Sequence, residues 1–155
     1  MHNHEPQNYQ CPFCRVVKGI EDEFVYSRQA DIFYRDEFLT AFVASHWWPN
    51  NRGHVIIVTN EHIENSYDLP DDLSDKIHRL EKKLMRALKE TYQCDGVSSR
   101  QHNEPCGGQD VWHYHLHIFP RYEKDKLYSL HEEKYLSKAE ERVPFAEKLR
   151  NCFKR

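Results

Sequence analysis

The chain has 155 residues, of which 39% are hydrophobic and 13% aromatic, and 22 Lys and Arg residues stand against 25 Asp and Glu residues. This length is enough for one domain with a substantial core, and 5 Gly and 7 Pro exclude collagen-like and wholly disordered classes. The formal net charge of −3, with no separate basic block, argues against binding to the backbone of a nucleic acid.

Residues 1–10 are polar and have neither the positive start nor the apolar stretch of a secretory signal. No apolar run approaches the roughly 18 residues that span a bilayer, so we expect a cytoplasmic protein without a membrane partner. We expect residues 1–10 to form a flexible tail and residues 11–155 a single domain. The odd count of 5 Cys favours free thiols or metal ligands over a disulfide framework.

Short runs rich in β-branched, aromatic or other apolar residues predict strands. The predicted strands are residues 24–26, 32–35, 39–43, 54–59, 97–100 and 111–119. After Pro70, apolar residues spaced by three or four predict one long amphipathic helix. These residues are Leu73, Ile77, Leu80, Leu84 and Leu88. Ser137 and Glu140 have capping-box spacing and predict a short C-terminal helix with Pro144 in or near its first turn. Together these elements indicate an α+β fold with a mostly antiparallel sheet.

Three histidines alternate with apolar residues in the predicted strand 111–119. Because successive strand residues point to opposite faces, His113, His115 and His117 are expected on one face. Tyr114, Leu116 and Ile118 then point into the core. Three aligned imidazoles gain little from burial, so this face indicates function. The imidazoles are either metal ligands or a nucleophile with neighbours that fix its tautomer.

The loop before these histidines favours the second alternative. Gly107 and Gly108 let backbone N–H groups approach an anion closely, and Gln109 adds amide donors. A phosphate held there would lie beside the middle imidazole, which favours phosphoryl chemistry over a purely metallic site.

The sequence Gly108-Gln-Asp-Val followed by His113-Tyr-His-Leu-His-Ile-Phe resembles the signature of the histidine triad (HIT) family. The resemblance extends over roughly residues 11–122, with Cys11-Pro-Phe-Cys14 and Gly53-His54-Val-Ile-Ile-Val in the family's order. It implies a HIT-like fold with a five-stranded antiparallel sheet, and a homodimer whose sheets join edge to edge.

The resemblance also implies hydrolysis or transfer of a nucleotidyl group at the α-phosphorus, through a covalent nucleotidyl-histidine. His115 would be the nucleophile, and His117 would hold the phosphate or move a proton. Backbone amides near Gly108 and the side chain of Gln109 would bind the non-bridging oxygens. His54 would support the triad from behind, and Asp110 and Asn103 complete the candidate substrate-binding residues. The implied substrate is a nucleoside phosphoramidate or a dinucleoside polyphosphate.

Cys11-x-x-Cys14 alone is compatible with a redox pair, half a zinc site or an incidental pair, although no thioredoxin-like pattern surrounds it. The resemblance implies a structural zinc bound by Cys11, Cys14, His62 and His113. Two thiolates and two imidazoles form a closed tetrahedral ligand set.

The sequence departs from the family pattern at several positions. Many relatives carry an Asp that grips the ribose hydroxyls, and the stretch 42–49 lacks it. In the same stretch, Trp47 and Trp48 are expected to stack on a substrate ring, or to pack in the core or a dimer interface. Relatives often have Ser or Thr at the position of Asp110.

The loop 101–106 also differs from the family pattern, and an ungapped match puts His102, not Asn103, at the usual Asn position. Cys106 is expected to be a small buried residue, although it is near enough to the site to be reactive.

Three other functions stay open from the sequence. A nucleotidyltransferase would share the first step and use an acceptor other than water. A nucleotide-binding or zinc-stabilised interaction module would bind without turnover. A metallohydrolase would use all three histidines of the 113–117 segment as metal ligands.

Overall fold

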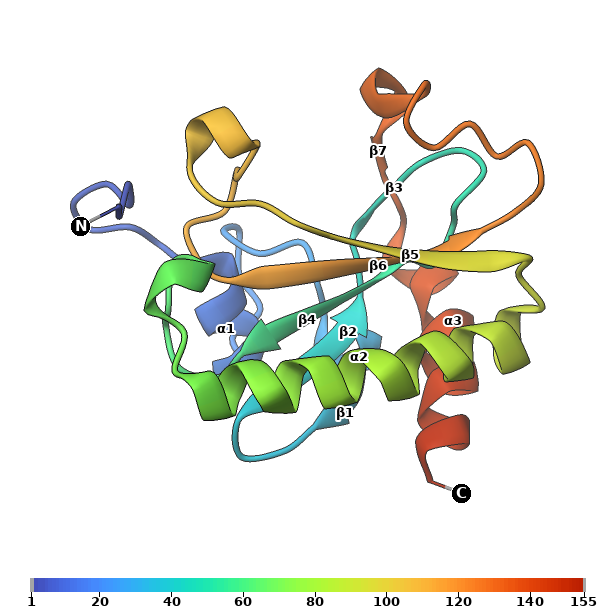
Figure 1. Cartoon of the computed structure of the whole chain (residues 1–155), viewed down its shortest axis with the longest axis horizontal. Coiled ribbons are helices and arrows are strands. Elements are labelled where there is room, and N and C mark those ends of the chain that lie inside the picture. The colour runs from blue at the N-terminus through green and yellow to red at the C-terminus, as the bar shows by residue number, and fades with distance from the viewer. Residues whose placement is uncertain (1, 155) are drawn as a thin grey trace.

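A five-stranded antiparallel sheet with strand order β1-β2-β4-β6-β5 forms the centre of the computed structural model, which describes residues 2–154 (Figure 1). The strands are β1 (Ile32–Arg35), β2 (Leu39–Val43), β4 (Val55–Thr59), β5 (Gly96–Gln101) and β6 (His115–Arg121). A small second sheet pairs β3 (His46–Trp47) with β7 (Tyr135–Leu136) and rises as an arm beside the main sheet. The expected α+β class with a five-stranded antiparallel sheet is confirmed.

Three α-helices accompany the sheet, α1 (Pro12–Lys18), α2 (Asp71–Tyr92) and α3 (Ala139–Phe153). Short 3₁₀ helices occur at Gln29–Asp31, Ser66–Asp68, Pro105–Gly107 and His131–Glu133. The five apolar residues that predicted α2 are all buried. Within residues 2–154, no helix is long and apolar enough to cross a membrane.

The alternation of side chains along the central strands divides the sheet into two faces. Val55 and Ile57 of β4 belong to the main hydrophobic core, which they share with residues of α2 and α3. Ile56 and Val58 point the other way and belong to a second cluster with residues of α1. The sheet face opposite α2 is therefore covered by α1 over part of its area only.

Two predicted strands differ from the structure. Residues 24–26 form no strand, because no neighbouring strand pairs with them. The predicted strand 111–119 begins only at His115, since the His113 N–H donates to the Val111 carbonyl in a tight turn (2.8 Å). The N–H of Tyr114 then donates to Ile63 (2.6 Å) instead of the sheet ladder.

The C-terminal helix is confirmed, but its start lies one residue later than the spacing indicates. The N-cap is Lys138, and its N–H donates to the carboxylate of Glu141, not of Glu140, at 3.0 Å. Pro144 lies in the second turn of α3 and not in its first.

Residues near the N-terminus lie against the segment after β4. The carboxylate of Glu64 accepts from the N–H groups of His4 (2.5 Å) and Glu5 (3.1 Å). Asn65 donates to the carbonyl of His2 at 3.3 Å. The flexibility of the tail in solution, and a single domain over residues 11–155, stay predictions.

A buried ion pair ties α3 to the chain near β1. The Arg142 guanidinium, 2% exposed, donates to Asp31 (2.9 Å), Ser137 (2.8 Å) and Tyr26 (3.0 Å). We expect Arg142→Met to lower the free energy of unfolding by about 3–5 kcal/mol, because it leaves the buried Asp31 carboxylate without its cation. Urea denaturation measures the change. The double variant Asp31→Asn/Arg142→Met is the control, and it should recover part of the loss; equal loss in both variants would contradict this account.

Candidate functional site

The histidines of β6 lie at the centre of the sheet face opposite α2. β6 is flanked by β4 on one side and β5 on the other. His117 is in register with Ile56 of β4 and with Arg100 of β5. Residues in register across antiparallel strands share a face. The expected common orientation of His115 and His117 is therefore present, while His113 precedes the strand and turns toward the N-terminal cysteines.

The tautomer of His115 is determined by one hydrogen bond. Its Nδ1 lies 2.7 Å from the carbonyl oxygen of His113. A carbonyl can only accept, so Nδ1 carries the proton and Nε2 keeps its lone pair. His115 is 2% exposed, and burial lowers its pKa. The ring is thus held neutral with Nε2 available as a nucleophile.

His117 and His54 extend this row of imidazoles. The ring of His117 lies 5.0 Å from that of His115 and 5.5 Å from that of His54, between centroids. Within residues 2–154, Nδ1 of His117 and both ring nitrogens of His54 have no hydrogen-bond partner. Burial lowers the pKa of His117 and lowers that of His54 to about 3. His54 stacks on Phe119 with 4.6 Å between ring centroids.

The buried neutral His54 makes stability depend on pH. Its pKa is about 3 in the folded chain against an ordinary value of 6.5, so its contribution is complete above pH 6.5 and is lost as pH falls toward 3. We expect the folded chain to lose about 2–3 kcal/mol between pH 6.5 and 4.5 from this group. His54→Phe keeps a stacking ring and should remove that part of the slope. Urea denaturation at the two pH values measures it, and parallel losses in both proteins would refute the assignment.

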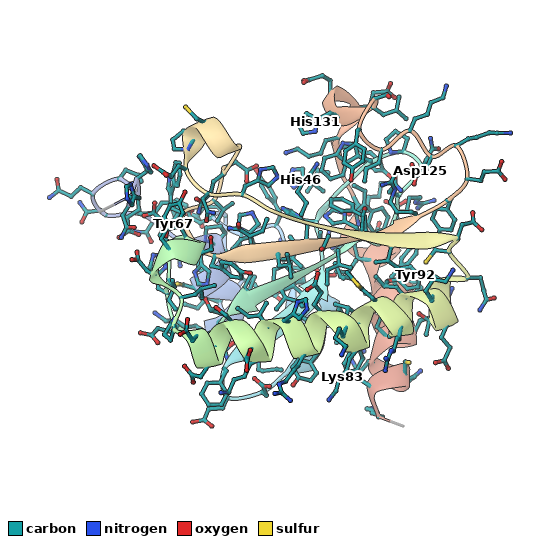
Figure 2. All side chains as sticks on the ribbon, viewed as in Figure 1. His46, Tyr67, Lys83, Tyr92, Asp125 and His131 are labelled. Atoms are coloured by element: carbon teal, nitrogen blue, oxygen red, sulfur yellow. The ribbon has the colours of Figure 1, made fainter. Side chains whose placement is uncertain are left out.

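A pocket of about 450 Å³ opens over these histidines. One side is largely apolar and contains Phe13, Val25, Ala44 and Ile56. The rest of the lining is mostly polar and aromatic and includes Trp48, Arg100, His102, Asp110, His131 and Lys134. Figure 2 shows His46 and His131 on the arm that rises beside the sheet. His115 and His117 line the pocket between these sides.

The glycine loop contributes less of its backbone than the sequence suggests. Gly108 lines the pocket with φ of +87°, and a Cβ there would lie 2.9 Å from Nδ1 of His102. The N–H groups of Gly107 and Gln109 already donate to the Glu104 carbonyl, and that of Gly108 donates to Pro105. These amides therefore close a turn within the loop.

Two predicted substrate-binding residues also hold the loop. The Gln109 carboxamide accepts from the Glu104 N–H (2.8 Å) and donates to the Glu64 carbonyl (2.7 Å). Asn103 accepts from Ser66 at 2.9 Å. Neither residue lines the pocket, whereas His54, Gly108 and Asp110 do.

Arg100 reaches the pocket from the edge strand β5 and His102 from just after it. Sequence reasoning assigned Arg100 no role, and it noted His102 only as the residue at the usual Asn position of the family. Arg100 lies on β5 and His102 directly follows the strand, so their spacing of two residues was the available signal. The two tryptophans separate, because Trp47 packs in the core against Phe145 while Trp48 lines the pocket. The expectation that Cys106 is buried is wrong, because it lies exposed in a 3₁₀ turn.

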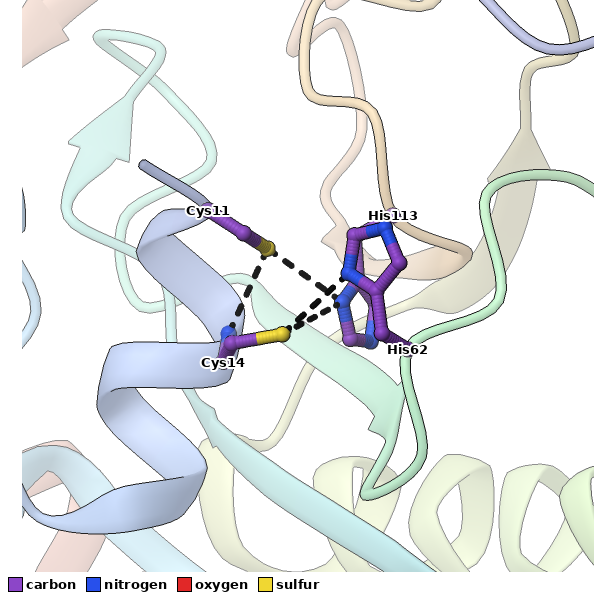
Figure 3. Close-up of side chains that lie close together, drawn as sticks. All are labelled: Cys11, Cys14, His62 and His113. Carbon is purple, nitrogen blue, oxygen red and sulfur yellow. Dashed lines mark hydrogen bonds between the residues drawn. The ribbon is translucent and has the colours of Figure 1, made fainter. Parts of the chain in front are cut away.

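The N-terminal cysteines meet two histidines beside the pocket. Cys11 Sγ lies 3.3 Å from Nδ1 of His113, and Cys14 Sγ lies 3.2 Å from Nδ1 of His62 (Figure 3). The four potential ligand atoms lie within 4.8 Å of one another. Ligand atoms around a tetrahedral zinc are about 3.3–3.8 Å apart, so this cluster fits a zinc ion. Hydrogen bonds from Cys11, His113 and His62 hold the pKa of the Cys14 thiol below its usual range.

Further contacts orient both histidines of the cluster. Nε2 of His113 lies 2.9 Å from the carbonyl oxygen of Thr59, and Nε2 of His62 lies 2.9 Å from the carboxylate of Glu5. Each partner holds the Nε2 proton and leaves the Nδ1 lone pair for a metal. Glu5 lies in the polar N-terminal segment, and no sequence pattern marked it as a partner of His62.

A family model described as HIT domain matches residues 27–124. The chain belongs to the HIT family. Among curated relatives, Protein hit of Bacillus subtilis is 31% identical over 114 residues, which cover 74% of this chain and 72% of that protein. An uncharacterized HIT-like protein of Methanocaldococcus jannaschii is 34% identical over 115 residues, which cover 74% of this chain and 81% of that protein. Adenosine 5'-monophosphoramidase of Candida albicans is 29% identical over 115 residues, which cover 72% of this chain and 70% of that protein.

Solved structures confirm the HIT fold. A Zn-bound histidine triad family protein of Mycobacterium smegmatis aligns with a TM-score of 0.73 and 23% identity, covering 94% of both chains. The diadenosine triphosphate hydrolase of Plasmodium falciparum aligns with a TM-score of 0.71 and 18% identity, covering 99% of this chain and 89% of its own. The relatives thus include a protein named as a monophosphoramidase, and the solved structures with this fold include a Zn-bound protein and a diadenosine triphosphate hydrolase.

Proposed function

We propose that this HIT-family chain is a nucleotide hydrolase that acts at the α-phosphorus through a covalent intermediate on His115. The observation that carries the proposal is the buried neutral imidazole of His115, with Nδ1 bound to the His113 carbonyl and Nε2 available. Membership of a family that includes a phosphoramidase and a diadenosine triphosphate hydrolase supports the same chemistry. The substrate would be a nucleoside phosphoramidate or a dinucleoside polyphosphate.

In the proposed reaction, His115 Nε2 attacks phosphorus and the bond to the leaving group breaks. Water then attacks the nucleotidyl-histidine and releases the nucleotide. His117 would hold a non-bridging oxygen or move a proton, since its ring adjoins that of His115. Gly108 would allow the close approach of the phosphate, while Gln109 and Asn103 would keep the loop in place.

We further propose that Cys11, Cys14, His62 and His113 hold a structural zinc ion. The ion would fix the N-terminal segment to the sheet and act on catalysis only through the position of His113. This assignment disfavours a metallohydrolase that uses all three histidines of the 113–117 segment as ligands, because Nδ1 of His113 faces the cysteines of the cluster and not the pocket. We also infer a cytoplasmic homodimer that binds neither nucleic acid nor membrane.

The test is turnover of adenosine phosphoramidate, diadenosine triphosphate and a nucleotide sugar by the wild-type chain. Release of AMP from either of the first two supports the hydrolase. Transfer of the nucleotidyl group to an added acceptor, faster than release to water, would instead indicate a nucleotidyltransferase. Nucleotide binding without turnover would contradict the proposal and favour a binding module.

A further inference from the structure

Arg100 is a charged residue of the pocket that neither the fold nor the proposed role of His115 requires. It lies on β5, the edge strand beside β6 (Figure 1). Its partner in register on β6 is His117. The two side chains share the face of the sheet on which the pocket lies. His115 and Arg100 therefore lie on adjacent strands, and His115 is two residues before the β6 residue that pairs with Arg100.

Aromatic rings hold the Arg100 guanidinium in place. It lies 5.3 Å from the ring centroid of Trp48 and 5.0 Å from that of Phe119. Such cation–π contacts keep an arginine fixed without neutralising its charge. Trp48 and Phe119 are themselves buried, and together with Leu127 they form a separate small cluster.

No carboxylate within residues 2–154 forms an ion pair with Arg100. Its Nε is buried and has no hydrogen-bond partner among these residues. Arg100 as a whole is half-buried, and a charge partly withdrawn from water is ordinarily paired, since its lost hydration is otherwise not compensated. Burial accordingly lowers the pKa of Arg100.

The surroundings make this end of the pocket positive. Asp110 is the carboxylate of the pocket wall, and it lies 3.7 Å from Nζ of Lys134. The neighbouring His54 and His117 are neutral because burial lowers their pKa values. Arg100 is thus a positive charge without an ion-pair partner in residues 2–154, and it lines the pocket, which favours a bound anion.

The position of this charge relative to His115 indicates which part of a substrate it meets. The ring of Phe13, on the apolar side of the pocket, lies 5.2 Å from that of His115, and His117 lies 5.0 Å away toward Arg100. An apolar wall suits a nucleoside, so the phosphorus at His115 would have the nucleoside on one side. The leaving group would then extend toward Arg100.

We propose that Arg100 forms an anion subsite beside His117 that binds a phosphate of the leaving group. This inference rests on the proposed function and narrows it to substrates that release a nucleoside phosphate or another phosphate chain, rather than ammonia. As the His115 Nε2–phosphorus bond forms, the phosphorus–oxygen bond to the leaving phosphate breaks and its electron pair stays on that oxygen. Arg100 stabilises the added negative charge and keeps its own proton.

Arg100→Met tests the proposal, because it keeps a long side chain over the two rings and removes the charge. We expect kcat/KM for diadenosine triphosphate to fall about 10- to 100-fold, with kcat/KM for adenosine phosphoramidate changed less than about threefold. Arg100→Lys should recover part of the lost rate. The matched control is Arg79→Met on α2, whose exposed side chain lies outside the pocket. Equal losses on both substrates would show that Arg100 only supports Trp48, and would overturn the proposal.

A binding measurement separates this inference from the proposed hydrolase. Calorimetry compares AMP with ADP, whose second phosphate occupies the leaving-group position. Wild type should bind ADP about tenfold or more tightly than AMP, and Arg100→Met should abolish that difference. If wild type turns over no substrate but shows this preference, the hydrolase fails and the anion subsite stands. If ADP binds no more tightly than AMP, the subsite fails whatever the turnover.

Discussion

His115→Ala is expected to reduce kcat on the preferred nucleotide by at least about 10⁴-fold, because a covalent mechanism has no substitute for its nucleophile. The neutral ring of His115 has its Nδ1 proton bound to the His113 carbonyl, so Nε2 is available for attack. The neighbouring His117 has an Nδ1 without a hydrogen-bond partner in residues 2–154. Steady-state kinetics measure the loss. Mass spectrometry of the wild type, quenched during turnover, should detect the nucleotidyl group on His115.

His78→Ala is the matched control, since His78 is an exposed residue of α2 outside the pocket over His115. It should leave kcat within about twofold of wild type. His115→Ala should still bind AMP, which shows that the fold and the pocket persist. Retention of more than about a tenth of wild-type kcat by His115→Ala would rule out the covalent mechanism.

Cys14→Ser is expected to lower the zinc content from about one ion per chain to almost none. Cys14 lies between both histidines of the cluster, at 3.2 Å from His62 and 3.6 Å from His113. Without the ion, we expect Tm to fall by roughly 6–12 °C, which corresponds to about 3 kcal/mol in a chain of this size. Elemental analysis and calorimetry measure the two effects.

The same loss of zinc should also affect His115, the proposed nucleophile. His113 offers Nδ1 to the cluster and its carbonyl to His115 Nδ1, so a loosened His113 no longer fixes the tautomer of His115. We expect kcat to fall about tenfold in Cys14→Ser. Cys106→Ser is the control, because Cys106 is exposed and outside the cluster. Full zinc content in Cys14→Ser would place the metal elsewhere.

Local pattern was sufficient for the elements that bury one continuous face. The period of α2 and the period-two alternation of β6 each identify a buried side, because burial of that side is what stabilises the element. The strand predicted at residues 24–26 failed for the converse reason. Its β-branched and aromatic residues suit a sheet, but strand propensity is realised only where a partner strand supplies hydrogen bonds.

The candidate site divides along the same line. The spacing of His115 and His117 placed both on one face, and the resemblance supplied the four residues of the metal cluster. The contacts of Gln109 and Asn103 were not predictable in this way. Their side chains form hydrogen bonds with Glu64 and Ser66, which belong to a distant segment of the chain. Such contacts are absent from any local pattern.

The sequence by itself determined the α+β class, the long helix, the HIT resemblance and the histidine face, because each depends on periodicity or on a short motif. Only the tertiary structure decided that Arg100 lies beside His117 and against the Trp48 ring, without an ion-pair partner among residues 2–154, and that Glu5 orients His62. Strand register and chain reversal bring these residues together across tens of positions. Neither the charge nor the hydropathy of a segment encodes which distant residue it meets.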